Sequence, residues 1–67
     1  MILVTRINKI DQFYINENLI EFIEEMPDTL VTLESGKKIV VMESAEELIE
    51  RIIEQKQRVM RYRDFQN

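Results

Sequence analysis

The alternation of apolar and polar residues predicts a series of short β-strands in the first part of the chain. Ile2–Ile7 and Phe13–Ile15 are rich in β-branched and aromatic residues, and the short connection between them predicts an antiparallel pair. Thr29–Leu33 and Lys38–Met42 are two further runs of this kind. Only the segment 34–37 separates them, which predicts a β-hairpin.

Two turn-forming residues support this division into strands. Gly36, the only glycine in the chain, stands where a short hairpin needs a residue that tolerates positive φ. Pro27, followed by Asp28, marks a turn before the third run, because proline presets φ and aspartate can bond the backbone beyond it.

The segment Asn16–Glu25 can be interpreted in two ways. A helix would have Asn16 or Asn18 as its cap and a stripe formed by Leu19, Ile20, Ile23 and Met26. A strand would direct Ile20 and Phe22 to one face and Leu19 and Ile23 to the other. We favour a strand for most of the segment, because a Pro-Asp turn and a strand-like run follow at once.

The clearest predicted element is a helix over about 45–61. Ser44 begins a Ser-Ala-Glu-Glu sequence, in which Ser44 and Glu47 can form a capping box. Apolar residues then recur at helical spacing: Ala45, Leu48, Ile49, Ile52, Ile53, Val59 and Met60. Acidic residues come first in this segment and basic residues last, which suits the helix dipole. We expect residues 62–67 to form a frayed tail.

These elements predict a single small α+β domain over residues 1–67. A small antiparallel sheet of about four to five strands, arranged as a meander over about 2–43, is followed by one C-terminal amphipathic helix. The central strands carry apolar residues on both faces, and one helix can cover only one of them. We therefore expect a homo-oligomer whose interface includes Ile49 and Ile53 on the helix flank.

Composition argues against most catalytic chemistry. The chain has no cysteine and no histidine, so we expect no disulfide, no metal site, no cofactor and no catalytic residue. The acidic residues between Asn16 and Ser35 are expected to line a solvated strand face rather than a carboxylate site. We predict a non-enzymatic protein, and the absence of cysteine fits a reducing cytoplasm. We expect no signal peptide, since no charged leader with a cleavage signal precedes the first strand, and no apolar run approaches a membrane span.

Basic and aromatic residues gather at the end of the helix. Arg58, Arg61 and Tyr62 could meet an acidic protein face, a nucleic acid or, peripherally, a membrane surface. The simpler interpretation is that the bases complement the helix dipole. A small nucleic-acid-binding regulator that uses this tail is therefore the alternative function. It ranks second because the net charge of −4 argues against a stable nucleic-acid complex.

Several short segments, in this order and spacing, resemble one protein family. They are Leu19–Glu24, Pro27–Thr29, Gly36–Lys38 and Val41–Ser44, and the resemblance extends over about residues 2–53. The family is the small flagellar FlbD family, also called the swarming motility protein SwrD family. The resemblance implies a cytoplasmic bacterial accessory protein that supports the output of the flagellar motor through contact with a motor or stator component. It implies no catalytic residues.

Overall fold

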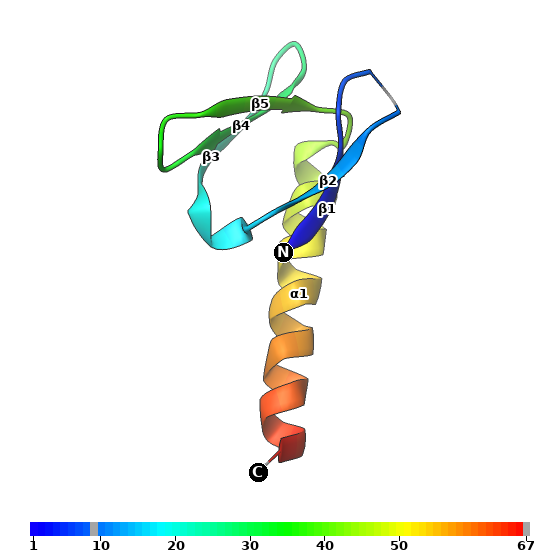
Figure 1. The fold of residues 1–67 in the computed structure, drawn as a ribbon, viewed down its shortest axis with the longest axis vertical. Coiled ribbons are helices and arrows are strands. Elements are labelled where there is room, and N and C mark those ends of the chain that lie inside the picture. Colours follow the sequence, from blue (N-terminus) through cyan, green and yellow to red (C-terminus); the bar gives the residue numbers. More distant parts are fainter. Residues whose placement is uncertain (9, 67) are drawn as a thin grey trace.

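The computed structural model describes the backbone of residues 1–8 and 10–66, and the side chains of these residues up to residue 61. This part of the chain forms five strands, one short 3-10 helix and one long α-helix, which confirms the predicted α+β class. In chain order the elements are β1 (Ile2–Thr5), β2 (Gln12–Ile15), η1 (Glu17–Leu19), β3 (Ile20–Glu25), β4 (Thr29–Leu33), β5 (Lys38–Val41) and α1 (Ala45–Gln66) (Figure 1).

The strands form two antiparallel sheets rather than one continuous meander. β1 pairs with β2, and β3, β4 and β5 form a second sheet with β4 in the centre. The chain leaves β2 through η1, so β2 and β3 do not pair with each other. The sheets meet at one bridge between Arg6 and Val41 and at a 2.9 Å hydrogen bond from the Met42 amide to the Thr5 carbonyl.

The ambiguous segment after β2 is mostly strand, as predicted, with a short helical turn at its start. The Asn16 side chain accepts a hydrogen bond from the Asn18 amide at 3.0 Å and so caps η1. β3 then begins at Ile20 and pairs with β4, with an irregularity between Ile20 and Phe22. Asn16, one of the two predicted caps, therefore caps a single helical turn. The chain then continues as a strand, because the backbone of β3 forms its hydrogen bonds with β4.

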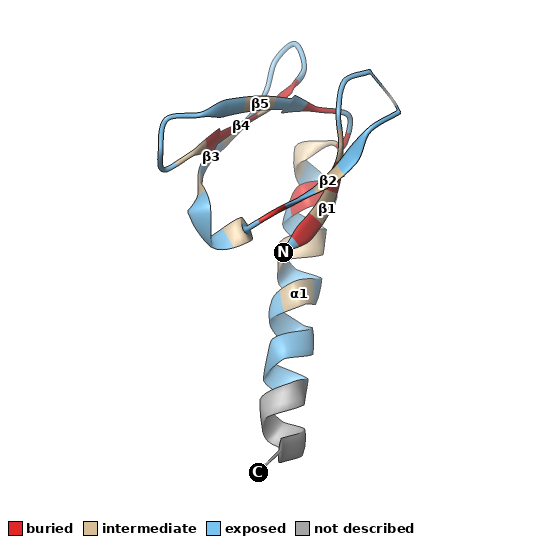
Figure 2. Cartoon of the chain, in the orientation of Figure 1, coloured by how far each residue is buried: buried red, intermediate tan, exposed pale blue. Residues whose placement is uncertain are grey.

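Both sheets and the start of α1 contribute to one small core. Among the described residues, six apolar side chains are almost completely buried: Ile2, Val4, Ile15, Val31, Val41 and Leu48 (Figure 2). The row formed by Ile23, Val31 and Ile39 faces this core, because cross-strand partners share a face of a sheet. β1, β2 and α1 therefore lie against one face of the β3–β5 sheet only.

α1 is longer and less buried than the sequence pattern predicted. It continues to Gln66 instead of ending near residue 61, and the side chains of the segment predicted as a frayed tail lie outside the described residues. Within the predicted apolar stripe Leu48 is fully buried and Ile52 packs against the core. Ile49, Ile53, Val59 and Met60 are exposed. The cause is geometric, since only the first half of the helix lies beside the strands (Figure 1).

The two predicted turns are present. Gly36 has φ of +91° between β4 and β5, where its amide donates to the Leu33 carbonyl at 2.8 Å. Pro27 lies between β3 and β4, and the peptide bond that precedes it is cis. Both residues therefore connect antiparallel strands, as the sequence predicted.

Candidate functional site

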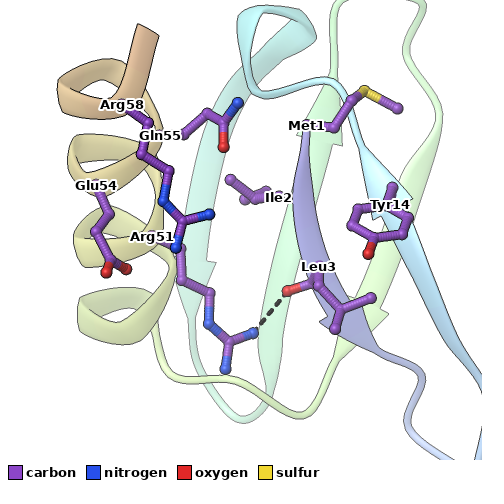
Figure 3. Close-up of a pocket in the computed structure, with 8 residues that line it drawn as sticks. All are labelled: Met1, Ile2, Leu3, Tyr14, Arg51, Glu54, Gln55 and Arg58. Atoms are coloured by element: carbon purple, nitrogen blue, oxygen red, sulfur yellow. Dashed lines mark hydrogen bonds between the residues drawn. The ribbon is translucent and has the colours of Figure 1, made fainter. Parts of the chain in front are cut away.

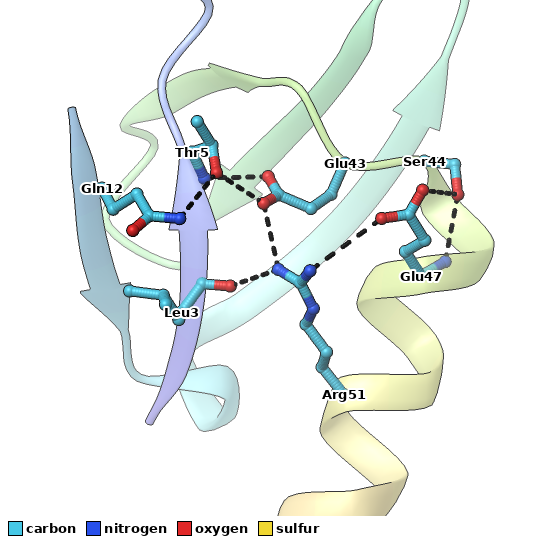
Figure 4. Close-up of polar contacts among 7 residues, drawn as sticks. All are labelled: Leu3, Thr5, Gln12, Glu43, Ser44, Glu47 and Arg51. Atoms are coloured by element: carbon cyan, nitrogen blue, oxygen red, sulfur yellow. Dashed lines mark hydrogen bonds and ion pairs between the residues drawn. The ribbon is translucent and has the colours of Figure 1, made fainter. Parts of the chain in front are cut away.

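The most connected polar group in the described part of the chain is the Glu43 carboxylate, which follows β5. It accepts hydrogen bonds from the Thr5 amide and from the Thr5 hydroxyl, each at 2.8 Å (Figure 4). The Arg51 guanidinium donates to the same carboxylate at 3.0 Å and to the Leu3 carbonyl at 2.6 Å. One carboxylate and one guanidinium thus join β1, the end of β5 and the second turn of α1.

The Glu43 carboxylate is buried but remains an acceptor for charged and polar donors. Only 6% of the residue is exposed. Burial alone raises the pKa of Glu43, but the hydrogen bonds from Thr5 and from the Arg51 guanidinium outweigh it, so the pKa lies below its usual value of 4.5. The side chain is therefore ionised at neutral pH and part of a satisfied ion pair, an arrangement suited to holding elements together rather than to proton transfer.

Sequence reasoning did not assign a role to Glu43. A signal was available, because Ile39, Val41 and Glu43 alternate and therefore point to the same face of the strand and its continuation. Val41 is buried, so a carboxylate two residues later needs a partner inside the fold. Arg51, eight residues further along the chain, is that partner. Its contact with Glu47 is longer, at 3.9 Å.

The predicted helix cap is confirmed. The Glu47 amide donates to the Ser44 hydroxyl at 3.1 Å, and that hydroxyl donates to the Glu47 carboxylate at 3.3 Å (Figure 4). The return contact of the capping box thus reaches the Ser44 side chain. Because Ser44 follows Glu43 directly, the same junction holds the ion pair and the start of the helix.

An open pocket of about 230 Å³ lies beside this junction, between β1, β2 and α1. Its lining combines apolar residues with two cations and one acid: Met1, Ile2, Leu3, Tyr14, Arg51, Glu54, Gln55 and Arg58 (Figure 3). Arg51 is committed to Glu43 and Leu3, which leaves Arg58 as the other base at the rim. This lining can recognise a polar side chain of another protein, but it brings no pair of carboxylates together.

The face of the β3–β5 sheet that points away from the core carries a second candidate surface. Phe22, Leu30 and Val40 lie on this face, since their register alternates with the buried row through Val31. Leu30 and Val40 are direct cross-strand partners. Phe22 is 56% exposed and Val40 is 37% exposed. We refer to these three residues as the outer sheet patch. An exposed apolar patch of this kind is typical of a protein-binding surface.

The interface residues predicted from sequence are separated on α1. Ile49 and Ile53 are 50% and 51% exposed and lie on one flank of the helix, one turn apart. Arg58 lines the pocket described above, and Arg61 is exposed. The Tyr62 side chain lies outside the described residues. Arg58 therefore lies on a different side of α1 from Ile49 and Ile53.

The described residues form neither a carboxylate cluster for a metal ion nor a membrane-spanning helix. No group of three or more Asp or Glu side chains in residues 1–8 and 10–61 is arranged to hold a metal ion. No helix in the part of the chain that the structure describes is long and apolar enough to cross a bilayer.

Comparison with known proteins places the chain in a family. The model of the FlbD family, described as flagellar and swarming motility proteins, matches residues 1–60. The match therefore includes both sheets, the Glu43–Arg51 junction and most of α1. No curated protein matches the chain, and no solved structure matches it. Since the family model covers nearly the whole sequence, this chain belongs to the FlbD family of flagellar and swarming motility proteins.

Proposed function

We propose that this chain supports flagellar motility as a non-catalytic cytoplasmic protein that binds a motor or stator component. The family places it in flagellar and swarming motility. The observation that carries the rest of the proposal is the outer sheet patch, because Phe22 and Val40 are exposed there and the half-buried Leu30 pairs with Val40 on the same face. Aromatic residues on such surfaces are frequent anchors of protein interfaces.

The junction of Glu43 and Arg51 supports the same interpretation. Its polar groups bond to one another and to the β1 backbone, so they stabilise the fold and leave the patch on a rigid sheet. A rigid platform loses little conformational entropy when it binds another protein. The chain thus resembles a small adaptor more than an enzyme.

Substitution of Phe22 by serine tests the proposal. The Phe22 ring lies on the exposed face, so Phe22→Ser should keep the fold while removing the apolar anchor. In cells whose only copy carries Phe22→Ser, we expect reduced swarming at unchanged protein level and unchanged number of flagella. Ile10→Ser is the matched control, because Ile10 is 82% exposed in the loop between β1 and β2 and belongs to no strand of the β3–β5 sheet.

Co-purification identifies the partner. We expect one stator or motor protein to co-purify with the parent and with Ile10→Ser, and to be absent from preparations of Phe22→Ser. Full swarming by the Phe22→Ser strain, or retention of the same motor protein by this variant, would show that the outer sheet patch is not the binding surface.

A further inference from the structure

The exposed flank of α1 repeats its apolar residues at the spacing of a helix-pairing seam. Ile49, Ile53, Lys56 and Met60 follow one another at intervals of four, three and four residues. This is the a/d spacing of a coiled coil, which places all four side chains along one side of a helix. Ile49, Ile53 and Met60 are 50%, 51% and 63% exposed, so the strands of the same chain do not cover them. We refer to these four residues as the helix seam.

The charges beside the seam indicate what covers it. Glu50 follows the first seam residue and Arg61 follows the last, and both are exposed. On this side of α1, Glu46 and Glu50 each precede a seam isoleucine by three residues, and Lys56 and Arg61 lie towards the other end of the seam. Glu54 and Arg58 line the pocket beside β1 and β2 and so do not flank the seam. A surface that is acidic at one end and basic at the other is complementary to itself when it is reversed.

From this we propose that two copies of the chain associate through an antiparallel pairing of their α1 seams. Ile49 of one copy then meets Met60 of the second copy, and Ile53 meets the aliphatic stem of Lys56. Lysine can pack its stem against apolar surface while its ammonium stays in water. Glu50 of each copy lies beside Arg61 of the other, and two-fold symmetry repeats every contact.

A parallel pairing would be less favourable. It would bring the acidic half of one helix against the acidic half of the other, and the basic halves together. Like charges at flanking positions destabilise a helix pair, and they select its orientation. The two helix dipoles also point in opposite directions, which is the favourable orientation for helices side by side, only in the antiparallel arrangement.

The seam is short, which sets the strength of the dimer. From residue 49 to residue 60 it extends about 17 Å at the usual helical rise. We therefore expect a monomer–dimer equilibrium that sedimentation equilibrium can follow between low and high micromolar protein. The parent should shift from 8.1 kDa towards twice that mass as concentration rises. A single 8.1 kDa species throughout this range would overturn the proposal.

Variants locate the interface. Ile53→Glu puts a charge in the centre of the seam twice per dimer, and we expect it to raise the dissociation constant by about tenfold or more. Phe22→Ser, on the outer sheet patch, should leave the dissociation constant unchanged. The reverse pattern, a dimer that tolerates Ile53→Glu and fails with Phe22→Ser, would place self-association on the sheet and overturn the proposal. Circular dichroism checks that each variant keeps its helix.

Cysteine cross-linking tests the orientation, and it does not depend on the folding of Ile53→Glu. Because the chain has no cysteine, Ile49→Cys and Met60→Cys each introduce a single thiol. Antiparallel pairing predicts that an oxidised mixture of the two variants forms disulfide-linked dimers between residues 49 and 60, in large excess over either variant alone. Equal cross-linking of each variant with itself would show a parallel pair and overturn the proposal. All these measurements use purified protein, so their outcome is independent of whether a motor protein binds the sheet.

Discussion

The Glu43 carboxylate accepts a hydrogen bond from the Arg51 guanidinium at 3.0 Å, and this contact joins the second residue after β5 to the second turn of α1. The same guanidinium reaches the Leu3 carbonyl, and the same carboxylate holds Thr5. Two side chains therefore determine how the helix meets the β1–β2 sheet. In a chain with so small a core, we expect such a junction to contribute noticeably to stability.

Glu43→Gln should destabilise the protein by about 1.5–3 kcal/mol, because it weakens hydrogen bonds to a charged group and leaves Arg51 with only its longer contact to Glu47. The free energy of unfolding from urea titration at neutral pH measures the change. Glu21→Gln is the matched control, since Glu21 is exposed on β3 and should change the stability little. Equal urea midpoints for Glu43→Gln and the parent would show that the junction adds nothing to stability.

The same pair predicts a pH dependence. The pKa of Glu43 in the folded protein lies below its usual value of 4.5, so the unfolded state binds a proton more readily than the folded state. The stabilisation is complete well above pH 4.5 and is lost as the pH falls through the lowered pKa. We expect the stability difference between the parent and Glu43→Gln to shrink over this acid range. The Glu17 carboxylate also has a lowered pKa, but both proteins share it, so it cancels from the difference.

A difference in stability that stays constant from neutral to acid pH would contradict this assignment. It would mean that Glu43 contributes through its shape alone, since the glutamine variant cannot titrate. Urea midpoints at a series of pH values for the two proteins provide the measurement.

Gly36→Val should cost more than about 1 kcal/mol, because a β-branched residue fits poorly at positive φ. An added Cβ would meet no atom within 4 Å, so the cost comes from the backbone conformation and not from a clash. Gly36→Asn is the informative control, since asparagine tolerates this region better. Thermal melting of the three proteins should rank them as parent, Gly36→Asn, Gly36→Val, and coincident melting of the parent and the valine variant would refute the strain.

Ser44→Ala should destabilise the protein by about 0.5–2 kcal/mol through loss of the N-cap. The hydroxyl accepts from the Glu47 amide at 3.1 Å, and alanine leaves that amide without this partner. Ser44→Thr keeps a hydroxyl and should retain most of the stability. Denaturant midpoints separate the two substitutions, and an alanine variant as stable as the parent would mean that the bond carries no net stabilisation.

The sequence by itself determined the local features of this protein. Strand runs with a period of two, the positive-φ glycine at position 36, and the serine cap of the helix all depend on neighbours within a few residues. These features are present in the structure. The family was also recognisable from short motifs in their order, and the family model that matches residues 1–60 agrees.

Only the tertiary structure decided how these pieces meet. The division of the strands into two sheets depends on which edges pair, and nothing in a strand's own pattern states this. The Glu43 carboxylate acquires its role from Thr5, which is 38 residues away in the chain. The helix pattern contains one wide apolar stripe, but packing buried Leu48 and left Ile49 and Ile53 exposed. The sequence shows which helix positions are apolar, whereas the position of the sheets decides which of those side chains are buried within one chain.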